Sequence, residues 1–374
     1  MPPPRMHALS LRGARRAAQD AAHRSSAYRQ LLAEHGLKPA ALQGALDLRR
    51  LPVLTKDNTF GRFSLDELAG PLDPRTIADV LTSSGRGGQT FGFRLASHRA
   101  HGQAWFDIDL GLQDAFDVDS RPTLIVNCLP MGVTFPSRAA TVANVSVRED
   151  MACAILKEVG AHYQQVLVCT DPLFVNRLLA EGRQRGVDWC ALNASFVLGE
   201  EMLVEAQREH IARHIGLDIE RDPRRWIGSS FGVGELGLNL LFETRETVRL
   251  NRAAQGDANL AHALGGPPPL ADDGEALLFC YNPLRCHVEV LDPDPAGWGE
   301  LCFTMLGRDA QIPLPRYTTG DVGRLVAPDQ LSAAATARGL PMPWLPLVSV
   351  RGRRADRPHG LPSVERVKAL IYRD

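Results

Sequence analysis

The sequence lacks the features that mark membrane, secreted and nucleic-acid-binding proteins. It has no apolar run near the roughly 18 residues that cross a bilayer, and its N-terminus lacks the apolar segment of a secretory signal. Lys and Arg total 42 against 43 Asp and Glu, so no net charge favours nucleic acid or an anionic membrane. We therefore expect a cytoplasmic protein with neither of these partners, which recognises any anionic ligand locally.

The cysteines do not suggest a disulfide framework, because they number 7 and are scattered through apolar segments. Buried free thiols are the expectation. Cys280, Cys286, His287 and Cys302 raise a metal site as an alternative, but adjacent strand residues such as Cys286 and His287 point to opposite faces. A covalent acyl-cysteine at Cys280 or Cys302 is a further alternative, against which their apolar context argues.

Helix-like and strand-like segments alternate through most of the chain. Helices are expected over residues 12–34, 96–112 and 151–159, and the β-branched segments 122–130 and 165–170 are typical of buried strands. This alternation predicts an α/β fold with a largely parallel sheet.

Beyond about residue 251 the composition changes. Glycines and prolines at 265–269 form a linker-like stretch, after which short strands and turns follow without a long helix. We predict α/β lobes at 1–265, an antiparallel β-rich lobe at 270–352 and a tail at 353–374 that ends in one short helix.

Four glycine-centred segments are the candidate ligand-binding elements. The first, over residues 81–92, resembles an anion-binding loop, because glycines let backbone N–H groups approach a phosphate and the Ser and Thr side chains add donors. It is not a Walker A loop, since Gln89 stands where that pattern requires lysine. The other three are Gly199-Glu200-Glu201, Phe231-Gly232-Val233-Gly234-Glu235 and Tyr317-Thr318-Thr319-Gly320-Asp321. Because ligands of α/β sheets bind at the carboxyl ends of strands, we expect these segments to come together.

The order of these segments resembles the large N-terminal domain of the acyl-adenylate-forming enzymes, and within them the phenylacetate-CoA ligase-like branch. Thr82-Ser83-Ser84-Gly85 is similar to the family's phosphate loop, and the turns at 199–201 and 231–235 are similar to its Gly-x-Glu and Tyr-Gly-x-Thr-Glu motifs. The segments 299–304 and 313–321, Arg351-Gly352-Arg353 and the opening segment 51–57 extend the resemblance over nearly the whole chain.

The resemblance implies attack of a carboxylate on the α-phosphorus of ATP, which gives acyl-AMP and pyrophosphate. The implied nucleotide-binding residues are Thr82, Ser83, Ser84, Gly85, Gly88, Gly199, Glu200, Glu201, Phe231, Gly232, Asp321 and Arg353. Phe231 would stack on adenine, Asp321 would accept from the ribose hydroxyls, and Glu235 would bind Mg²⁺. Met131, Gly132, Phe135 and Trp226 would form the wall of a pocket for an aryl or apolar acid. Without the resemblance, a core position for the aromatics and a surface or capping role for the carboxylates explain the same residues.

The sequence departs from the family in three ways. The loop has no lysine, and we hypothesise that Arg86 supplies part of the phosphate contacts and acts in catalysis. Gly234 replaces the usual threonine, so a water, Ser229 or Ser230 would have to supply its hydroxyl. The chain reaches only Asp374, where the family's mobile C-terminal domain with its lysine would begin.

The first expectation is therefore an ATP- and Mg²⁺-dependent acid–thiol ligase that transfers the acyl group to CoA. Amide formation, or acyl transfer to a carrier protein as in acyl-protein synthetases, is the second. A non-catalytic nucleotide- or acyl-binding protein is the third, motivated by Gln89 and Gly234. The acid, the acceptor and the oligomeric state, including a homodimer, stay open.

Overall fold

The computed structural model describes residues 3–43, 47–83, 90–130, 132–134, 136–266, 276–307, 309–353 and 364–372. Within these residues the strands form an 11-stranded sheet and a 2-stranded sheet of β1 (Ile77–Thr82) and β2 (Phe93–Ser97). The order of the large sheet is β10-β11-β12-β13-β9-β8-β7-β6-β5-β3-β4. Its first strands are β3 (Thr123–Asn127), β4 (Thr141–Asn144), β5 (Gln165–Thr170), β6 (Ala194–Leu198), β7 (Ile227–Val233) and β8 (Gly237–Phe242). Its later strands are β9 (Leu277–Tyr281), β10 (Cys286–Leu291), β11 (Gly299–Met305), β12 (Tyr317–Val326) and β13 (Leu347–Arg353).

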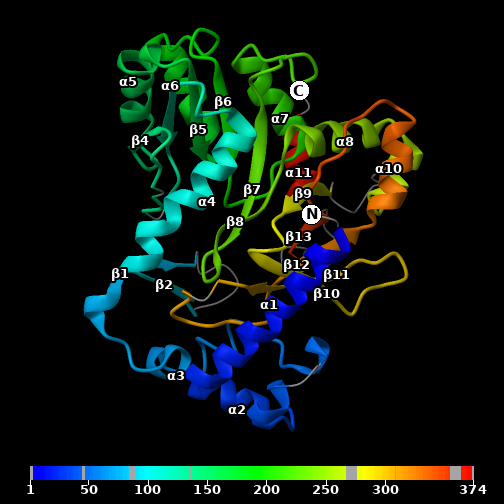
Figure 1. Cartoon of the computed structure of the whole chain (residues 1–374). Coiled ribbons are helices and arrows are strands. Elements are labelled where there is room, and N and C mark those ends of the chain that lie inside the picture. The colour runs from blue at the N-terminus through cyan, green and yellow to red at the C-terminus, as the bar shows by residue number, and fades with distance from the viewer. Residues whose placement is uncertain are drawn as a thin grey trace.

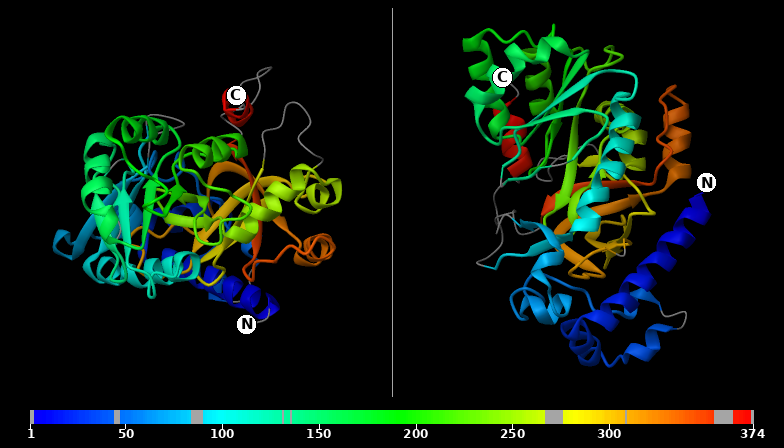
Figure 2. Two further views of the ribbon diagram at one scale, coloured as in Figure 1. Left: turned by 90° about the horizontal axis from the view of Figure 1, so that it is seen from above. Right: turned by 60° about the vertical axis from the view of Figure 1, so that its left-hand side comes forward.

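The strands from β3 to β7 pair in parallel, and both faces of this half of the sheet are covered. Leu124 and Val126 face an apolar cluster that includes α5 (Glu149–Glu158) and α6 (Phe174–Arg185), whereas Ile125 faces a cluster that includes the end of α4 (His98–Phe116). Helices accordingly lie on either side of the sheet when the molecule is viewed from above (Figure 2). Burial on both faces explains why these strands are continuous apolar runs, and the predicted α/β class is confirmed.

The strands from β8 to β13 are antiparallel, so the predicted antiparallel region is present. Because β8 pairs with β9, both regions belong to one sheet, and the expected division at 1–265, 270–352 and 353–374 stays a prediction. Three helices pack together beside the antiparallel strands: α8 (Arg245–Gln255), α9 (Ala258–Ala263) and α10 (Pro328–Thr336). The expectation of no long helix beyond residue 269 missed α10. Its proline at the first turn and its alanine run favour a helix.

The N-terminal helices lie at the opposite end of the molecule from α5 and α6 (Figure 1). The expected helix over 12–34 is two helices, α1 (Pro3–Arg24) and α2 (Ser26–Glu34), because Ser25 leaves the helical conformation and caps α2 through Tyr28 N. Thr55 exchanges hydrogen bonds with Asn58 and closes a turn. The remaining helices are α3 (Leu65–Ala69), α7 (Glu205–His214), α11 (Val364–Ile371) and the short η1 (Pro39–Gln43), η2 (Leu48–Arg50), η3 (Pro74–Thr76) and η4 (Gly160–His162).

All seven cysteines are free, and the prediction of buried thiols is confirmed for six of them; Cys190 is exposed. Burial raises the pKa of Cys280 to about 12 and also raises the pKa of Cys302, so neither thiol is poised as a nucleophile. In the part of the chain that the structure describes, no helix is both long enough and apolar enough to cross a bilayer.

Candidate active site

A cavity of about 1000 Å³ lies where the carboxyl ends of the parallel strands meet two hairpins, β1–β2 and β7–β8. Its walls include residues from all four glycine-centred segments. The predicted residues that line it are Thr82, Ser83, Gly199, Glu200, Trp226, Gly232, Glu235 and Arg353. The position of the cavity follows from the topology, because strand ends at one edge of an α/β sheet leave a crevice.

The residues at the base of the glycine-rich segment form a buried polar cluster. Ser83 N donates to Gly92 O at 3.0 Å, and Gly92 N donates to Ser83 Oγ at 3.0 Å, so the two ends of the segment are held together. Lys56 Nζ donates to Ser83 Oγ at 2.9 Å and lies 3.2 Å from Glu235 Oε1. We call Lys56, Ser83 and Glu235 the loop-base cluster. It places a cation, a hydroxyl and a carboxylate at the entrance to the glycine-rich segment.

Two glycines allow this close approach. A Cβ at Gly92 would overlap the Glu235 side chain. A Cβ at Gly234 would lie 3.0 Å from Ser83 Cα and 3.1 Å from Thr82 O, tighter than ordinary van der Waals contact. The absence of the threonine that the family carries at position 234 therefore has a steric reason here: the two hairpins pack backbone against backbone.

A carboxylate oxygen of the cluster, Glu235 Oε1, lies near the buried hydroxyl of Tyr317 as well as near Lys56. Glu235 Oε1 and the Tyr317 hydroxyl are buried and form no hydrogen bond of regular geometry with any of the described residues. Burial, together with the nearby Glu235 carboxylate, raises the pKa of Tyr317, so the phenol keeps its proton. A buried donor, an ionisable acceptor and an ammonium group suit a phosphate and its counter-cation better than they suit a closed protein core.

The carboxylate and guanidinium proposed to contact ribose lie opposite each other on β12 and β13. Asp321 and Arg353 are cross-strand partners, with Arg353 Nε 3.4 Å from Asp321 Oδ1. Thr319 Oγ1 also donates to Asp321. Arg353 lines the cavity, whereas Asp321 lies behind it and is buried.

The turn after β6 is held from outside the cavity. Glu200 lines the cavity with a φ of 69°, a conformation that is rare for a residue other than glycine. The next residue, Glu201, points away and pairs with Lys368 of α11 at 2.6 Å. The C-terminal helix therefore contacts the same turn that contributes Glu200 to the cavity.

Of the two described aromatic residues proposed for the site, one lines the cavity and one does not. Phe231 does not line the cavity; it packs against Phe279 and Phe303, with ring centroids 6.5 and 5.9 Å apart. Trp226 does line it and stacks on Phe116 at 5.3 Å. Gly132 sits in a turn beside the lining residue Val133. The other predicted positions, Ser84, Gly85, Arg86, Gly88, Met131 and Phe135, lie outside the described residues.

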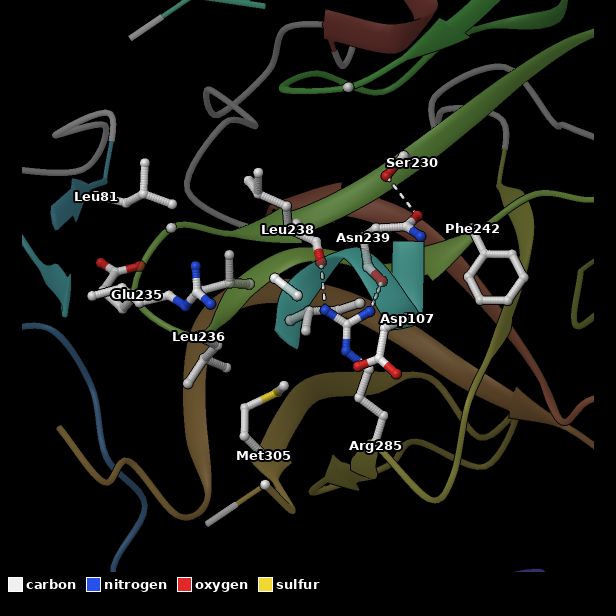
Figure 3. A pocket seen from close by; sticks show the side chains of 18 of the residues that line it. Leu81, Asp107, Ser230, Glu235, Leu236, Leu238, Asn239, Phe242, Arg285 and Met305 are labelled. Carbon is white, nitrogen blue, oxygen red and sulfur yellow. Dashed lines mark hydrogen bonds between the residues drawn. The ribbon is translucent and has the colours of Figure 1, made fainter. Parts of the chain in front are cut away.

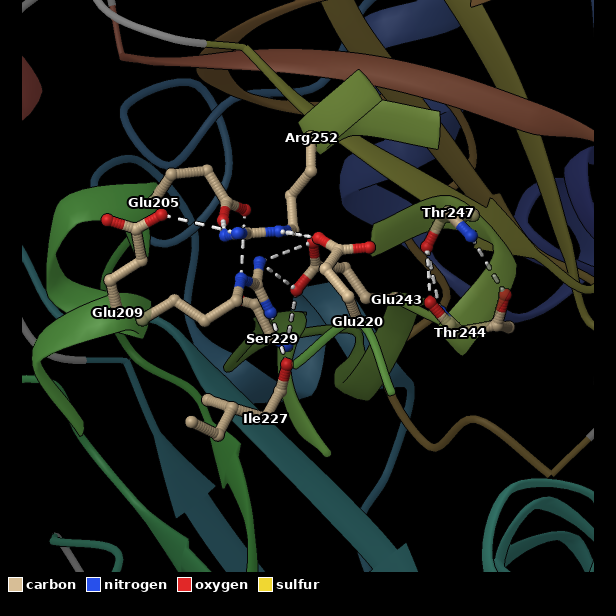
Figure 4. A network of polar contacts seen from close by, with 10 residues as sticks. Glu205, Glu209, Glu220, Ile227, Ser229, Glu243, Thr244, Thr247 and Arg252 are labelled. Atoms are coloured by element: carbon tan, nitrogen blue, oxygen red, sulfur yellow. Dashed lines mark hydrogen bonds and ion pairs between the residues drawn. The ribbon is translucent and has the colours of Figure 1, made fainter. Parts of the chain in front are cut away.

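A network of charged side chains supports the part of the cavity wall that Ser229 and Glu243 form (Figure 4). Arg208 of α7 is fully buried; its Nε donates to Glu205 at 2.8 Å and its Nη2 donates to both oxygens of Glu243 at 2.8 and 2.9 Å. Glu243 also accepts from Ser229 N at 2.7 Å, and both of these residues line the cavity. Arg252 joins the network through Glu205. The network ties α7 and α8 to the ends of β7 and β8.

Sequence reasoning missed the roles of Lys56 and Arg208. Lys56 lies within the opening segment 51–57, and no local pattern links it to Ser83, 27 residues away. Arg208 and Glu205 lie on an ordinary charged helix in the sequence, and Glu243 is 35 residues away from Arg208. No group of three or more His, Cys, Asp or Glu side chains in the described ranges is arranged to hold a metal ion.

Comparison with known proteins identifies the fold. No protein-family model and no curated protein matches the sequence. The structure is similar to that of 2-hydroxyisobutyryl-CoA ligase in the postadenylation state with 2-HIB-AMP, with a TM-score of 0.67 and 16% identity over 100% of this chain and 74% of that one. The same ligase in the thioesterification state, with 2-HIB-AMP and CoA, gives 0.62 and 16% over 87% and 65%. The chain thus spans about two thirds to three quarters of that enzyme, and it has the α/β fold of the large domain of adenylate-forming enzymes.

Proposed function

We propose that the protein activates a carboxylic acid with ATP, forming acyl-AMP and pyrophosphate, and transfers the acyl group to CoA or another thiol. The observation that carries the proposal is the loop-base cluster, in which a lysine and a carboxylate meet at the glycine-rich segment inside the cavity. The fold supports it, since the similar ligase binds an acyl-AMP and CoA.

The loop-base cluster supplies what adenylation requires at the phosphates. Lys56 would bind a phosphate oxygen in place of the lysine that the loop lacks, and the Tyr317 hydroxyl would donate to the same group. Glu235 would hold Mg²⁺, which neutralises phosphate charge when bound. Glu235 Oε1 is buried and its partners here are the Lys56 ammonium group at 3.2 Å and the nearby Tyr317 hydroxyl, so the carboxylate would be shared between these groups and the cation.

The remaining proposed contacts follow from the cavity wall. Gly199 and Glu200 would border the adenine, while Arg353, held by Asp321, would orient the ribose. Ser229 and Ser230 line the cavity beside Gly232, where either hydroxyl would replace the one absent at Gly234. Catalysis would then consist of aligning the carboxylate with the α-phosphorus and neutralising charge, without a covalent enzyme intermediate.

The proposal is tested by acid-dependent exchange of pyrophosphate into ATP across a panel of carboxylic acids. Lys56→Ala and Glu235→Gln are each expected to lower the exchange rate by about 10²–10³-fold, the usual cost of losing one charge-stabilising contact. Lys38→Ala, at an exposed lysine, is the control and should exchange at the wild-type rate. Full exchange by the Lys56 variant would contradict the role of the cluster.

The alternatives differ in measurable ways. ATP binding without exchange for any acid would favour a non-catalytic nucleotide-binding protein, the interpretation that Gln89 and Gly234 motivate. Where exchange occurs, acyl transfer to CoA, to amines and to carrier proteins should be compared. Transfer to an amine or a carrier protein but not to CoA would favour the second expectation, which is amide formation or acyl transfer to a carrier protein, over formation of a CoA thioester.

A further inference from the structure

One face of β7 presents almost no side chains to the cavity. Ile227 packs into the apolar core on one side of the sheet. Residues alternate along a strand, so Gly228, Ser230 and Gly232 face the other side, and all three line the cavity. Ser230 Oγ donates to Asn239 Oδ1 of β8 at 2.9 Å, which turns this side chain toward β8 (Figure 3). β7 therefore offers a strip of bare backbone that leads away from the loop-base cluster.

α4 forms the wall that faces this strip. It lies over the same side of the sheet, because its last residue, Phe116, stacks on Trp226 just before β7. A Cβ at Gly111 would meet no heavy atom within 4 Å, so the space beside the middle of the helix is open. Asp107 and Asp114 also line the cavity, but both are exposed to solvent. The row that lines the cavity at helical spacing consists of small or apolar residues, namely Ala104, Ile108, Gly111 and Ala115.

We call the space between this row and the strip on β7 the strand channel, and Trp226 closes one end of it. A Cβ at Gly228 would lie 2.2 Å from Trp226 Cζ3, so the indole lies across the strand where only glycine leaves room for it. Phe116 stacks on the indole, with centroids 5.3 Å apart and 18° between the ring planes. Because Trp226 precedes β7 and Glu235 follows it, the rings and the loop-base cluster mark opposite ends of the channel.

The residues around the two rings are apolar. Leu167 and Cys169 of β5 and Val197 of β6 lie on the same side of the sheet and line the cavity. Burial raises the pKa of Cys169 to about 12, so its thiol is uncharged. An ionised group among these side chains would lose its hydration, whereas a hydrocarbon would gain from burial. This end of the strand channel therefore suits the methyl end of a chain.

The strand sets the length of a chain that fits. Gly228 and Gly232 are four residues apart, which is about 13 Å along a β-strand. A fully extended chain advances about 1.2 Å per bond, as the polypeptide does over its three bonds per residue. An acid with its carboxylate beside Gly232 would therefore reach the indole over Gly228 with about ten carbons.

We propose that the strand channel holds the hydrocarbon chain of a straight-chain acid of about six to ten carbons, and that Trp226 sets the upper limit of its length. This inference rests on the proposed function and narrows the aryl or apolar acid expected from the sequence. A single-ring acid would cover only about half of the distance from Gly232 to the indole. The carboxylate would face the loop-base cluster, and the chain would lie along β7.

The test is a series of straight-chain acids from acetate to palmitate in pyrophosphate exchange. We expect kcat/KM of the wild type to rise about fourfold per methylene, the gain for burying one CH₂, and to fall beyond about ten carbons. Trp226→Ala opens the end of the channel and should move this limit to longer acids. An unchanged limit in a folded variant would overturn the inference, as would a wild-type preference for phenylacetate over octanoate.

A second variant blocks the channel instead of opening it. Gly111→Leu places a side chain in the open space and should lower kcat/KM for octanoate, relative to acetate, by at least tenfold. Gly102→Leu is the matched control, because Gly102 also borders open space but lies nine residues away on the opposite face of α4. It should keep the wild-type profile. If Gly111→Leu raised the KM for CoA and left the use of octanoate unchanged, the channel would hold the acceptor and the inference would fail.

Direct binding separates this inference from the proposed function. Calorimetry without ATP should show octanoate binding to the wild type and to Gly102→Leu, and at least tenfold weaker binding to Gly111→Leu. If no acid supports exchange but this pattern holds, the strand channel stands and the activity fails. Equal affinity of the two leucine variants for octanoate would overturn the inference. Urea unfolding should confirm that each variant is folded.

Discussion

Gly234 shows how one missing side chain sets the distance between two hairpins. A Cβ there would lie 3.0 Å from Ser83 Cα, so a larger residue must push backbone away from backbone. Gly234→Thr is expected to lower the free energy of unfolding by about 1–3 kcal/mol, the usual cost of overpacking, although threonine is the residue of the related motif. Urea denaturation would measure this loss.

A second glycine provides the control for this substitution. Gly102 lies within α4, and a Cβ added there would meet open space, with no heavy atom of a neighbouring side chain within 4 Å. Gly102→Ala should be neutral or stabilise by up to about 1 kcal/mol through helix propensity. If Gly234→Thr were as stable as the wild type, the two hairpins would not be packed as described.

Arg208 is the residue whose loss should cost the most stability. Its guanidinium is fully buried and contacts two buried carboxylates, Glu205 and Glu243. Arg208→Met would leave both carboxylates without their shared cation and should lower the free energy of unfolding by about 3–5 kcal/mol. Arg185→Met breaks the exposed pair with Glu181 and should cost under about 1 kcal/mol. Similar unfolding midpoints for the two variants would refute the structural role of Arg208.

At the scale of elements, α1 contacts β10 through a buried histidine. Ser10 Oγ lies 2.9 Å from His287 Nδ1, and burial, with the charges of His7 and Arg316, lowers the pKa of His287 from 6.5 to about 4. The unfolded chain binds this proton near pH 6.5, whereas the folded chain binds it only near pH 4. Stability is therefore fully present above about pH 6.5 and falls between pH 6.5 and 4, by up to about 3 kcal/mol.

Substitution of His287 tests this dependence. Urea unfolding of His287→Gln between pH 7 and 4 should show a smaller loss of stability than the wild type over that window. His162→Gln, at an exposed histidine of η4, should follow the wild-type curve. An unchanged slope for the His287 variant would mean that other groups carry the pH dependence.

The elements that could be predicted from the sequence are those with the most uniform surroundings. The segments 122–130 and 165–170 match β3 and β5, because strands buried on both faces become continuous apolar runs. The β1–β2 hairpin and α10 were missed, since each is mixed in polarity and stabilised by distant partners.

The site, too, could be predicted from the sequence only where the signal is local. Motifs located the turns, but the contact between Lys56 and Ser83, 27 residues apart, leaves no local signal. The core position of Phe231 was the alternative that its apolar side chain alone suggested.

At the scale of the molecule, α11 joins the end of the described chain to the cavity. Lys368 pairs with Glu201 at 2.6 Å, and the Tyr372 hydroxyl accepts from Asn176 of α6. Lys368→Ala should weaken this docking, so hydrogen exchange should rise in α11 and in residues 199–202. Exchange in α1, which is remote from this contact, serves as the internal control. Faster exchange confined to α11 would show that the helix does not restrain the turn.

The strand order has a consequence for how the protein is made. β13 is the last strand of the large sheet along the chain, yet it is an interior strand of that sheet and lies between β12 and β9. A ribosome releases β9 about 70 residues before the partner that completes its pairing, so the antiparallel half stays open until residue 353 has emerged. During synthesis the nascent chain is therefore expected to expose apolar strand edges of β9 and β12 until β13 pairs with both.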